Sequence, residues 1–284
     1  MKKLALSLAV ISALSLSACD SETIEDAKQK AIDNGTVVTP SARIVFDPGA
    51  EVPRLSIPND LLFSGSLDGT LELPVNDPSD FSDPTVAMSA LDGWSTTQPF
   101  LIEIDFPEGT SLNAASVAMP GSVHIYETLM GGDTSDADCA VLPRGVACKV
   151  VSELTFGVDF ISQASGNSVA IVPLKPLNPK TSYVVALTNQ LTDNNDKAIA
   201  GSLSYESVRQ DINEKPLATE SQLLLQGLTN SFESAVVAAG ANKDSLIYTF
   251  ALTTQSIQDT LFTAKGLLAA PLAQGGLPPV ISVA

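Results

Sequence analysis

The fold of this chain is decided by the stretch Tyr183-Val-Val-Ala-Leu187, an unbroken apolar run that follows the turn-forming pair Asn178-Pro179. A short run of this kind, rich in β-branched residues, is typical of a buried β-strand. The longer run Leu246-Ile-Tyr-Thr-Phe-Ala-Leu-Thr253 predicts a second strand near the other end of the chain. These two stretches indicate a β-rich core.

Further short runs extend the pattern outward from these two strands. Phe100-Leu-Ile-Glu-Ile-Asp-Phe106 alternates in its second half, so Ile102, Ile104 and Phe106 would share one face of a strand. The other strands that we predict are 43–46, 71–75, 123–126 and 169–172. Because turn residues separate them, the expected fold is mainly β, an antiparallel β-sandwich.

Helices are expected as additions to the sandwich. Residues 219–239 carry apolar side chains near the 3.6-residue period, with a capping pair at Thr219 and Gln222 and a stop signal at Gly240. A second helix is predicted over 256–270, ending before Pro271, and a shorter one over 83–91.

The composition of the chain argues against several classes of function. The chain has 284 residues, of which 44% are apolar and 17% charged, so it has material for a core and is not disordered throughout. Its formal net charge is −17, which argues against nucleic acid as a partner. With His124 as its single histidine, the chain offers one candidate base for a Ser-His-Asp site and no histidine-rich metal site.

The N-terminus has the features of a secretory leader. Lys2 and Lys3 precede an apolar run that is too short to span a membrane, and this run ends in Leu16-Ser17-Ala18-Cys19. The last four residues resemble the lipobox of bacterial lipoproteins, which implies cleavage after residue 18 and acylation of Cys19. Acyl chains would anchor the exported protein to a membrane. The outer membrane or cell surface is the expected location, and Asp20 keeps the inner membrane open as an alternative.

This pattern predicts four segments. Residues 1–18 form the lipoprotein signal peptide, 19–40 a flexible tether in which 24–33 could be helical, 41–273 the folded domain, and 274–284 a linker. The linker composition, Gln274-Gly-Gly-Leu-Pro-Pro279, suggests that something once followed it.

Cys139 and Cys148 are predicted to form a disulfide. Pro143 and Gly145 between them favour a tight reversal that brings the two side chains within bonding reach, and export permits oxidation. A redox or metal pair is the alternative, but the CxxC spacing and partner ligands are missing.

Four small clusters are candidate sites, and each has a structural alternative. Ser95 in Gly93-Trp94-Ser95 is either a nucleophile or part of a structural corner, and His124 is either a base or a strand residue with a local partner. Asp133, Asp136 and Asp138 could hold a structural calcium ion or form a solvated loop. Residues 193–196 are a hairpin turn or, less well, a cation site. We expect no metal and no other cofactor.

Two stretches resemble known families. Leu174-Lys-Pro-Leu-Asn-Pro-Lys-Thr-Ser-Tyr183, with the turn at 193–196, is similar to a bacterial Ig-like module, which implies an Ig-like sandwich. An ordered series resembles the N-terminal domain of bacterial virulence-factor lipases, which are extracellular or surface lipoproteins. Its members are Ile57-Pro-Asn-Asp-Leu-Leu-Phe63, Asp68-Gly-Thr-Leu71, Asn76-Asp-Pro78, Ala90-Leu-Asp-Gly-Trp-Ser-Thr-Thr97, Pro99 and Phe250-Ala-Leu-Thr-Thr-Gln-Ser256.

The lipase resemblance implies an α/β-hydrolase domain after this one, with its serine in a G-x-S-x-G elbow. Serine stands two positions after Gly93, Gly109 and Gly166, yet none of these stretches has the second glycine. No catalytic residue is therefore predicted here. The expected role is a lipid-anchored domain that tethers and presents a hydrolase domain, which is also its possible partner. The alternative is a free-standing Ig-like lipoprotein that binds a protein or a glycan.

Overall fold

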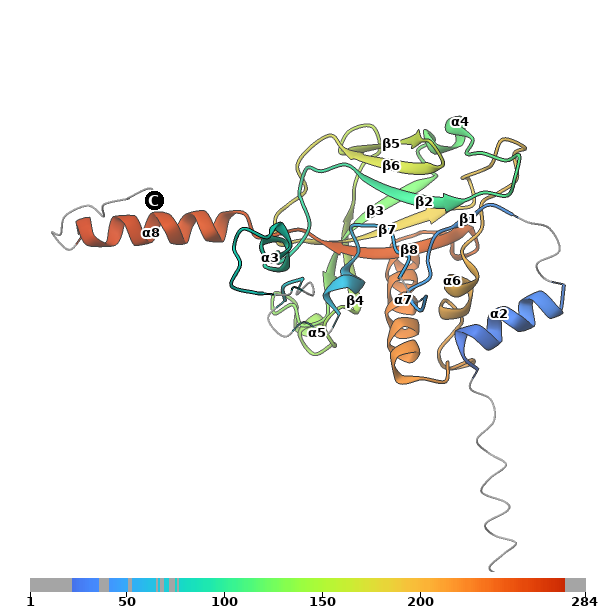
Figure 1. The fold of residues 1–284 in the computed structure, drawn as a ribbon, viewed down its shortest axis with the longest axis horizontal. Coiled ribbons are helices and arrows are strands. Elements are labelled where there is room, and N and C mark those ends of the chain that lie inside the picture. Colours follow the sequence, from blue (N-terminus) through green and yellow to red (C-terminus); the bar gives the residue numbers. More distant parts are fainter. Residues whose placement is uncertain are drawn as a thin grey trace, which may run out of the picture.

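The computed structural model describes residues 22–35, 41–50, 53–64, 66, 69–71, 75 and 77–273 (Figure 1). The predicted signal peptide, Cys19 and the linker 274–284 lie outside these residues, as does most of the strand expected at 71–75.

The strands are β1 (Arg43–Ile44), β2 (Phe100–Asp105), β3 (Val123–Met130), β4 (Ala147–Glu153), β5 (Phe160–Ser165), β6 (Ser168–Pro173), β7 (Ser182–Thr188) and β8 (Leu246–Thr253). The helices are α2 (Ile24–Asp33), η1 (Asp60–Phe63), α3 (Pro84–Ser89), α4 (Ala114–Val117), α5 (Ala137–Ala140), α6 (Leu203–Val208), α7 (Glu220–Ala238), η2 (Lys243–Ser245) and α8 (Gln258–Ala273).

The strands form two antiparallel sheets, with the orders β1-β2-β6-β5 and β4-β3-β7-β8. Without β4, these orders are those of the two sheets of a seven-stranded immunoglobulin sandwich, and β4 occupies the edge where variable-type domains add a strand. The predicted mainly-β sandwich with added helices is confirmed.

A tyrosine at the start of β7 completes the likeness. Tyr183 is buried, and its hydroxyl oxygen accepts a hydrogen bond from the backbone N–H of Asn178 at 3.0 Å. Immunoglobulin-like domains carry such a tyrosine corner near the start of the corresponding strand. The Pro179 turn and the apolar run that follows it are thus locked together by one side chain.

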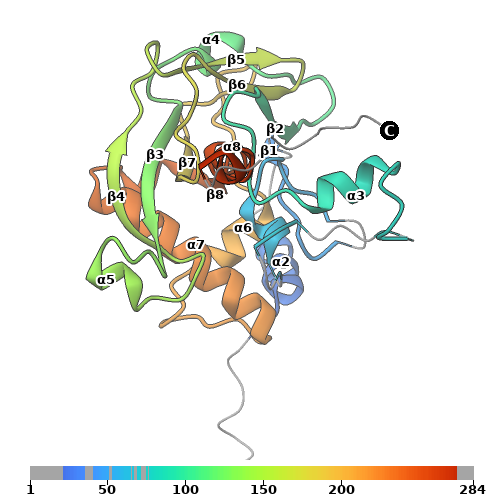
Figure 2. The same ribbon diagram turned by 90° about the vertical axis from the view of Figure 1, so that its left-hand side faces the viewer.

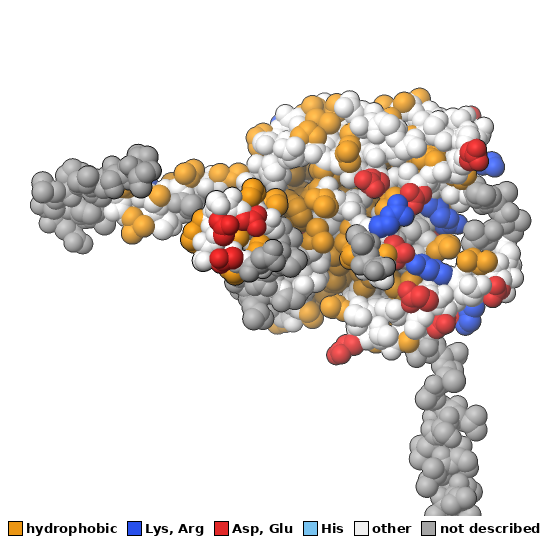
Figure 3. Space-filling model, in the orientation of Figure 1, with side chains coloured by type: hydrophobic (Ala, Val, Ile, Leu, Met, Phe, Trp, Pro, Cys, Tyr) orange, Lys and Arg blue, Asp and Glu red, His pale blue; other side chains and the backbone are white. Residues whose placement is uncertain are grey.

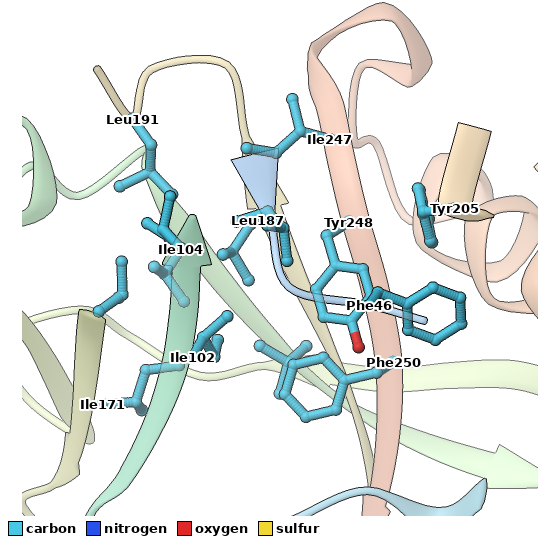
Figure 4. Close-up of a cluster of buried hydrophobic side chains, with 14 of the residues drawn as sticks. Phe46, Ile102, Ile104, Ile171, Leu187, Leu191, Tyr205, Ile247, Tyr248 and Phe250 are labelled. Atoms are coloured by element: carbon cyan, nitrogen blue, oxygen red, sulfur yellow. The ribbon is translucent and has the colours of Figure 1, made fainter. Parts of the chain in front are cut away.

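The core lies between the two sheets. Ile102 and Ile104 of β2 and Ile171 of β6 face Leu187 of β7 and Phe250 of β8 (Figure 4). Aromatic rings extend this cluster toward α6, where Tyr205 meets Tyr248 edge to face with 5.1 Å between ring centroids. The alternation that predicted one apolar face for residues 100–106 therefore marks the side of β2 that is turned to the second sheet.

A third layer covers the other face of the β4-β3-β7-β8 sheet. Helix α7 contacts β4, β7 and β8, and a second apolar cluster fills the space between, with Leu228, Phe232 and Val236 of α7 against Val184 and Ala251 of the sheet. Because β7 and β8 are covered on both faces, nearly all of their residues are buried and their sequences are largely apolar. Helices α6 and α7 both belong to the connection between these two strands.

Two strands escaped the sequence prediction. β4 and β5 lie at the edges of their sheets, and their outer residues are polar or exposed. The apolar pattern is therefore weak in β4 and β5, whereas β8, which also lies at a sheet edge, is recognisable because α7 covers its second face. At 43–46, the regular strand is limited to β1.

Helix α7 agrees with its prediction: Thr219 caps its start and Gly240 follows its end with φ of 107°. The bounds predicted for the last helix were wrong. α8 starts at Gln258 and passes Pro271 to end at Ala273. The proline removes one backbone hydrogen bond and crowds the carbonyl four residues before it, and because it lies in the last turn this local cost does not stop the helix earlier.

Helix α2 changes the expectation for the tether. The helical alternative for 24–33 is what the structure has, and a capping box between Thr23 and Asp26 starts the helix. α2 contacts α6, buries Ile24, and is joined to the sandwich by an ion pair between Lys28 and Asp47 at 3.0 Å. This part of the segment is therefore packed on the domain.

Candidate functional site

A carboxylate joins three distant stretches of the chain. Asp60 of η1 accepts hydrogen bonds from the Trp94 indole at 3.0 Å, from the Thr253 backbone N–H at 2.8 Å and from the Thr253 hydroxyl at 2.6 Å. The Trp94 ring packs edge to face on Phe63 with 5.4 Å between centroids. Burial raises the pKa of Asp60 above its usual value, against the opposing effect of the bonds from Thr253 and Trp94. We call Asp60, Trp94 and Thr253 the three-way joint.

The stretch around Ser95 is a structural corner. The Ser95 hydroxyl oxygen accepts hydrogen bonds from the backbone N–H groups of Thr97 and Gln98, and the side chain is exposed. Gly93 passes so close to β8 that an added Cβ would lie 2.6 Å from the backbone nitrogen of Gln255. The serine thus shapes a turn, and the glycine permits the close approach of two chain segments.

His124 has a local partner on the neighbouring strand. Its Nδ1 lies 2.6 Å from Oε1 of Glu153, and its ring stacks on that of Tyr126 with 6.0 Å between centroids. Burial and the charge of Glu153 raise the pKa of Tyr126 to about 12. Within the part of the chain that the structure describes, no hydrogen bond links His124 to Ser95 or to another hydroxyl.

The acidic loop is organised by its own backbone. Asp133 accepts a hydrogen bond from the Ser135 N–H, and Asp136 caps α5 and pairs with Lys149 at 3.3 Å. These bonds lower the pKa of both carboxyls. Over the described residues, no three acidic, histidine or cysteine side chains gather as a metal site would need.

The turn at 193–196 is the hairpin that the sequence predicts. Asp193 is buried, and its carboxylate accepts hydrogen bonds from the N–H groups of Asn195 and Lys197. Asp196 adopts a positive φ of 59°, as a tight turn requires. The carboxylate of Asp193 is thus used to hold the turn.

The predicted disulfide is present. Cys139 of α5 and Cys148 of β4 are bonded, with 5.6 Å between their Cα atoms, and a turn from Pro143 to Val146 reverses the chain between them. The base of this disulfide loop is tight, because a Cβ on Gly131 would lie 1.9 Å from the carbonyl oxygen of Pro143. The disulfide therefore fixes the hairpin of β3 and β4 at its tip.

The disulfide loop forms one side of a groove of about 910 Å³. Its lining also includes η1, with Asp60 and Thr253 of the three-way joint, and residues of β3, β7, β8 and α7. Apolar side chains in this lining include Met130, Leu228, Phe232 and Ala251. Four carboxylates and two cations stand around it: Asp60, Asp92, Glu127, Asp133, Arg144 and Lys180.

A charged cluster is buried on the far end of α7. Glu233 accepts hydrogen bonds from the Arg209 Nε and from the Tyr205 hydroxyl, both at 2.9 Å, and that hydroxyl also lies 2.9 Å from the Thr249 Oγ1. Burial raises the pKa of Tyr205 well above its usual value, and the charge of Glu233 adds to this shift. The cluster links α6 and α7 to β8 by hydrogen bonds, so its role in this arrangement is structural.

The three-way joint is what sequence reasoning missed, although a signal for it existed. Each of its members lies in one of the stretches that carried the lipase resemblance: 57–63, 90–97 and 250–256. The ordered motifs therefore meet at one place in space, where they hold the sandwich together beside the groove.

Comparison with known proteins agrees with these motifs. The sequence profile of the family described as bacterial virulence factor lipase N-terminal matches residues 23–277. The chain belongs to this family. It is also similar to the extracellular lipase of Aeromonas hydrophila, with 29% identity over 214 residues that cover 72% of this chain and 29% of that lipase.

The lipase N-terminal domain thus includes α2 and α8 as well as the sandwich, because the match extends over both helices. It spans less than a third of the length of the Aeromonas lipase. None of the helices in its described residues has the length and apolar character needed to cross a bilayer.

Proposed function

We propose that this chain is the lipid-anchored, non-catalytic N-terminal domain of a bacterial extracellular lipase, and that it tethers and presents a hydrolase domain at a lipid surface. The single observation that carries the proposal is the family match over residues 23–277. An extracellular relative is consistent with export, and the lipobox-like ending at Cys19 supplies a point for acylation.

The structural use of the candidate catalytic groups supports the non-catalytic role. The Ser95 hydroxyl accepts hydrogen bonds within a backbone turn, and the His124 ring contacts the carboxylate of Glu153. An ester hydrolase would need a hydroxyl, an imidazole and a carboxylate in mutual hydrogen-bond contact, with donors for the developing oxyanion.

Labelling with a radioactive or alkyne-bearing palmitate tests the anchor. We expect the full-length protein to take up the label and to sediment with membranes, whereas Cys19→Ser abolishes both. The double variant Cys139→Ala/Cys148→Ala is the matched control, because it removes two thiols and keeps the lipobox. Loss of label in the control, or unlabelled wild-type protein in the soluble fraction, would contradict anchoring at Cys19.

Ester turnover tests the absence of catalysis. The purified chain is expected to hydrolyse p-nitrophenyl butyrate no faster than buffer does. Turnover that disappears in Ser95→Ala or His124→Ala would overturn the non-catalytic role, whereas residual turnover that survives both changes would indicate a contaminating esterase.

The groove supports a second candidate, a free-standing lipoprotein that binds a glycan or protein ligand. Its mixed lining of apolar and charged side chains is typical of a binding site. Sequencing past codon 284 separates the two candidates: a reading frame that encodes G-x-S-x-G favours the lipase domain, and an unrelated gene favours the free-standing binder.

A further inference from the structure

Helix α8 leaves the sandwich and exposes apolar side chains in every direction. Figure 1 shows the helix extending away from the two sheets, Figure 2 shows it end-on, and Figure 3 shows hydrophobic side chains along it. Leu261, Phe262 and Leu267 are exposed to 66%, 64% and 70%. With 3.6 residues per turn, these three side chains point in directions roughly 100–140° apart around the helix axis. The apolar side chains of α8 are therefore spread around its axis, and its polar residues, such as Asp259, Thr263 and Lys265, lie in its first half and do not form one separate face.

A helix whose apolar side chains point to every side is stabilised when these side chains are enclosed, either by protein or in a membrane. The sixteen residues of α8 reach about 24 Å, less than the roughly 30 Å of hydrocarbon that a spanning helix must cross. It also lacks the cationic face of helices that lie on a membrane surface, since Lys265 is its one basic residue. These features favour enclosure by protein.

The base of the helix contacts the sandwich through two polar interactions. Asp259 in its first turn pairs with Lys180 at 2.6 Å, and the backbone N–H of Ser256 donates to Asp92 at 3.1 Å. Both partners line the groove, next to the three-way joint. The direction in which α8 leaves is thus set by the folded domain.

The family match indicates what encloses the helix. The match ends at residue 277, close after the end of α8 at Ala273, and the family is named as the N-terminal part of lipases. In the Aeromonas lipase, the aligned region is 29% of the protein, so most of that enzyme lies outside this domain. Of the elements described here, α8 is the last in the chain and thus nearest to that remainder.

We propose that α8 is the docking element of this domain and that it inserts into an apolar cleft of the hydrolase part of the lipase. The proposal rests on the proposed function, because it takes a hydrolase domain as the occupant. Docking of this kind would bury Leu261, Phe262 and Leu267 together, while the pair Lys180–Asp259 fixes the angle between the two domains.

Amide hydrogen exchange measured by mass spectrometry tests the docking. The full chain carrying Cys19→Ser, which takes no acyl chain and is kept free of detergent, is compared alone and with a saturating amount of the hydrolase part of the Aeromonas lipase, meaning the portion beyond the aligned region. We expect exchange in residues 258–273 to slow by about tenfold or more when this probe is added. In Leu261→Glu/Leu267→Glu the slowing is lost, whereas Phe81→Glu, which alters a side chain that is 87% exposed elsewhere, keeps it.

Three outcomes would overturn the proposal. They are unchanged exchange in α8 with the probe, slowing that needs only phosphatidylcholine vesicles, and slowing that rises with the concentration of the chain alone. The first denies docking, the second assigns the helix to lipid and the third to a second copy. Each leaves palmitate labelling at Cys19 intact, so failure of the docking is distinguishable from failure of the proposed function.

Discussion

Helices α7 and α8 stand on either side of β8 in the chain and differ in what covers them. Helix α7 lies along the sheet and buries seven of its residues, including Phe232 and Val236. Helix α8 contains Leu261, Phe262 and Leu267 with most of their surface exposed. Apolar content is therefore not what separates a helix that belongs to this domain from one that points out of it. The difference lies in whether a partner surface is present.

The largest expected contrast between the two helices is in core packing. Phe232→Ala should lower the free energy of unfolding by about 3–5 kcal/mol, because the ring is buried between α7 and the sheet and leaves a cavity. Leu267→Ala on α8 should leave it nearly unchanged, because that side chain is 70% exposed. Urea unfolding followed by circular dichroism measures both, and equal losses would break the comparison.

Breaking a charged pair should also cost more stability on α7 than on α8. Glu233→Ala removes the partner of Arg209 from a buried cluster on α7 and should cost about 3 kcal/mol of unfolding free energy. Asp259→Ala removes the partner of Lys180 at the exposed base of α8 and should give no measurable loss. A large loss for Asp259→Ala would show that α8 is stabilised by the sandwich more than its contacts indicate.

The disulfide tests how much α7 depends on the hairpin beside it. The Ser231 hydroxyl oxygen of α7 accepts a hydrogen bond at 3.0 Å from the backbone N–H of Ala147, next to Cys148. Cys139→Ala/Cys148→Ala should lower the unfolding free energy by about 2–3 kcal/mol, since the closed loop is short. Amide exchange should quicken in α7 and stay unchanged in α8, and the reverse order would contradict the contacts described.

The smallest expected effect is a pH dependence at the three-way joint, where β8 leads into α8. Burial raises the pKa of Asp60 above its unfolded value of 3.8. The folded state therefore binds this proton more tightly, so the stability that Asp60 contributes is largest below the unfolded pKa and is lost as pH rises through the folded pKa.

Melting temperatures of wild type and Asp60→Asn, measured from about pH 3 to about pH 7, isolate this contribution. The melting temperature of the wild type minus that of the variant should fall as pH rises. A value that stays constant or increases with pH would contradict the raised pKa of Asp60.

The sequence reveals the strands that are covered on both faces far better than the joints between them. Residues 183–187 and 246–253 are recognisable because β7 and β8 are buried along almost their whole length and are largely apolar. β4 and β5 are hidden because many of their residues are polar or exposed, and the docking of α2 depends on contacts distant in the chain, such as burial of Ile24 and one ion pair of Lys28.

The candidate site shows the same limit. The disulfide was predictable because its cysteines are nine positions apart in the chain with a turn between them. The three-way joint was not, because Asp60 lies 34 residues from Trp94 and 193 residues from Thr253. The groove depends on the same long-range contacts, so no local pattern marks it.

The insertion of α6 and α7 between β7 and β8 also governs when the sandwich can form. These two strands are neighbours in the sheet, yet residues 189–245 separate them in the chain. Their pairing closes a long loop and must await the synthesis of everything up to Thr253. Until then the edge of β7 that pairs with β8 is open and available to other strands. The domain is therefore expected to be most prone to misassembly late in its synthesis, in the interval before β8 is available.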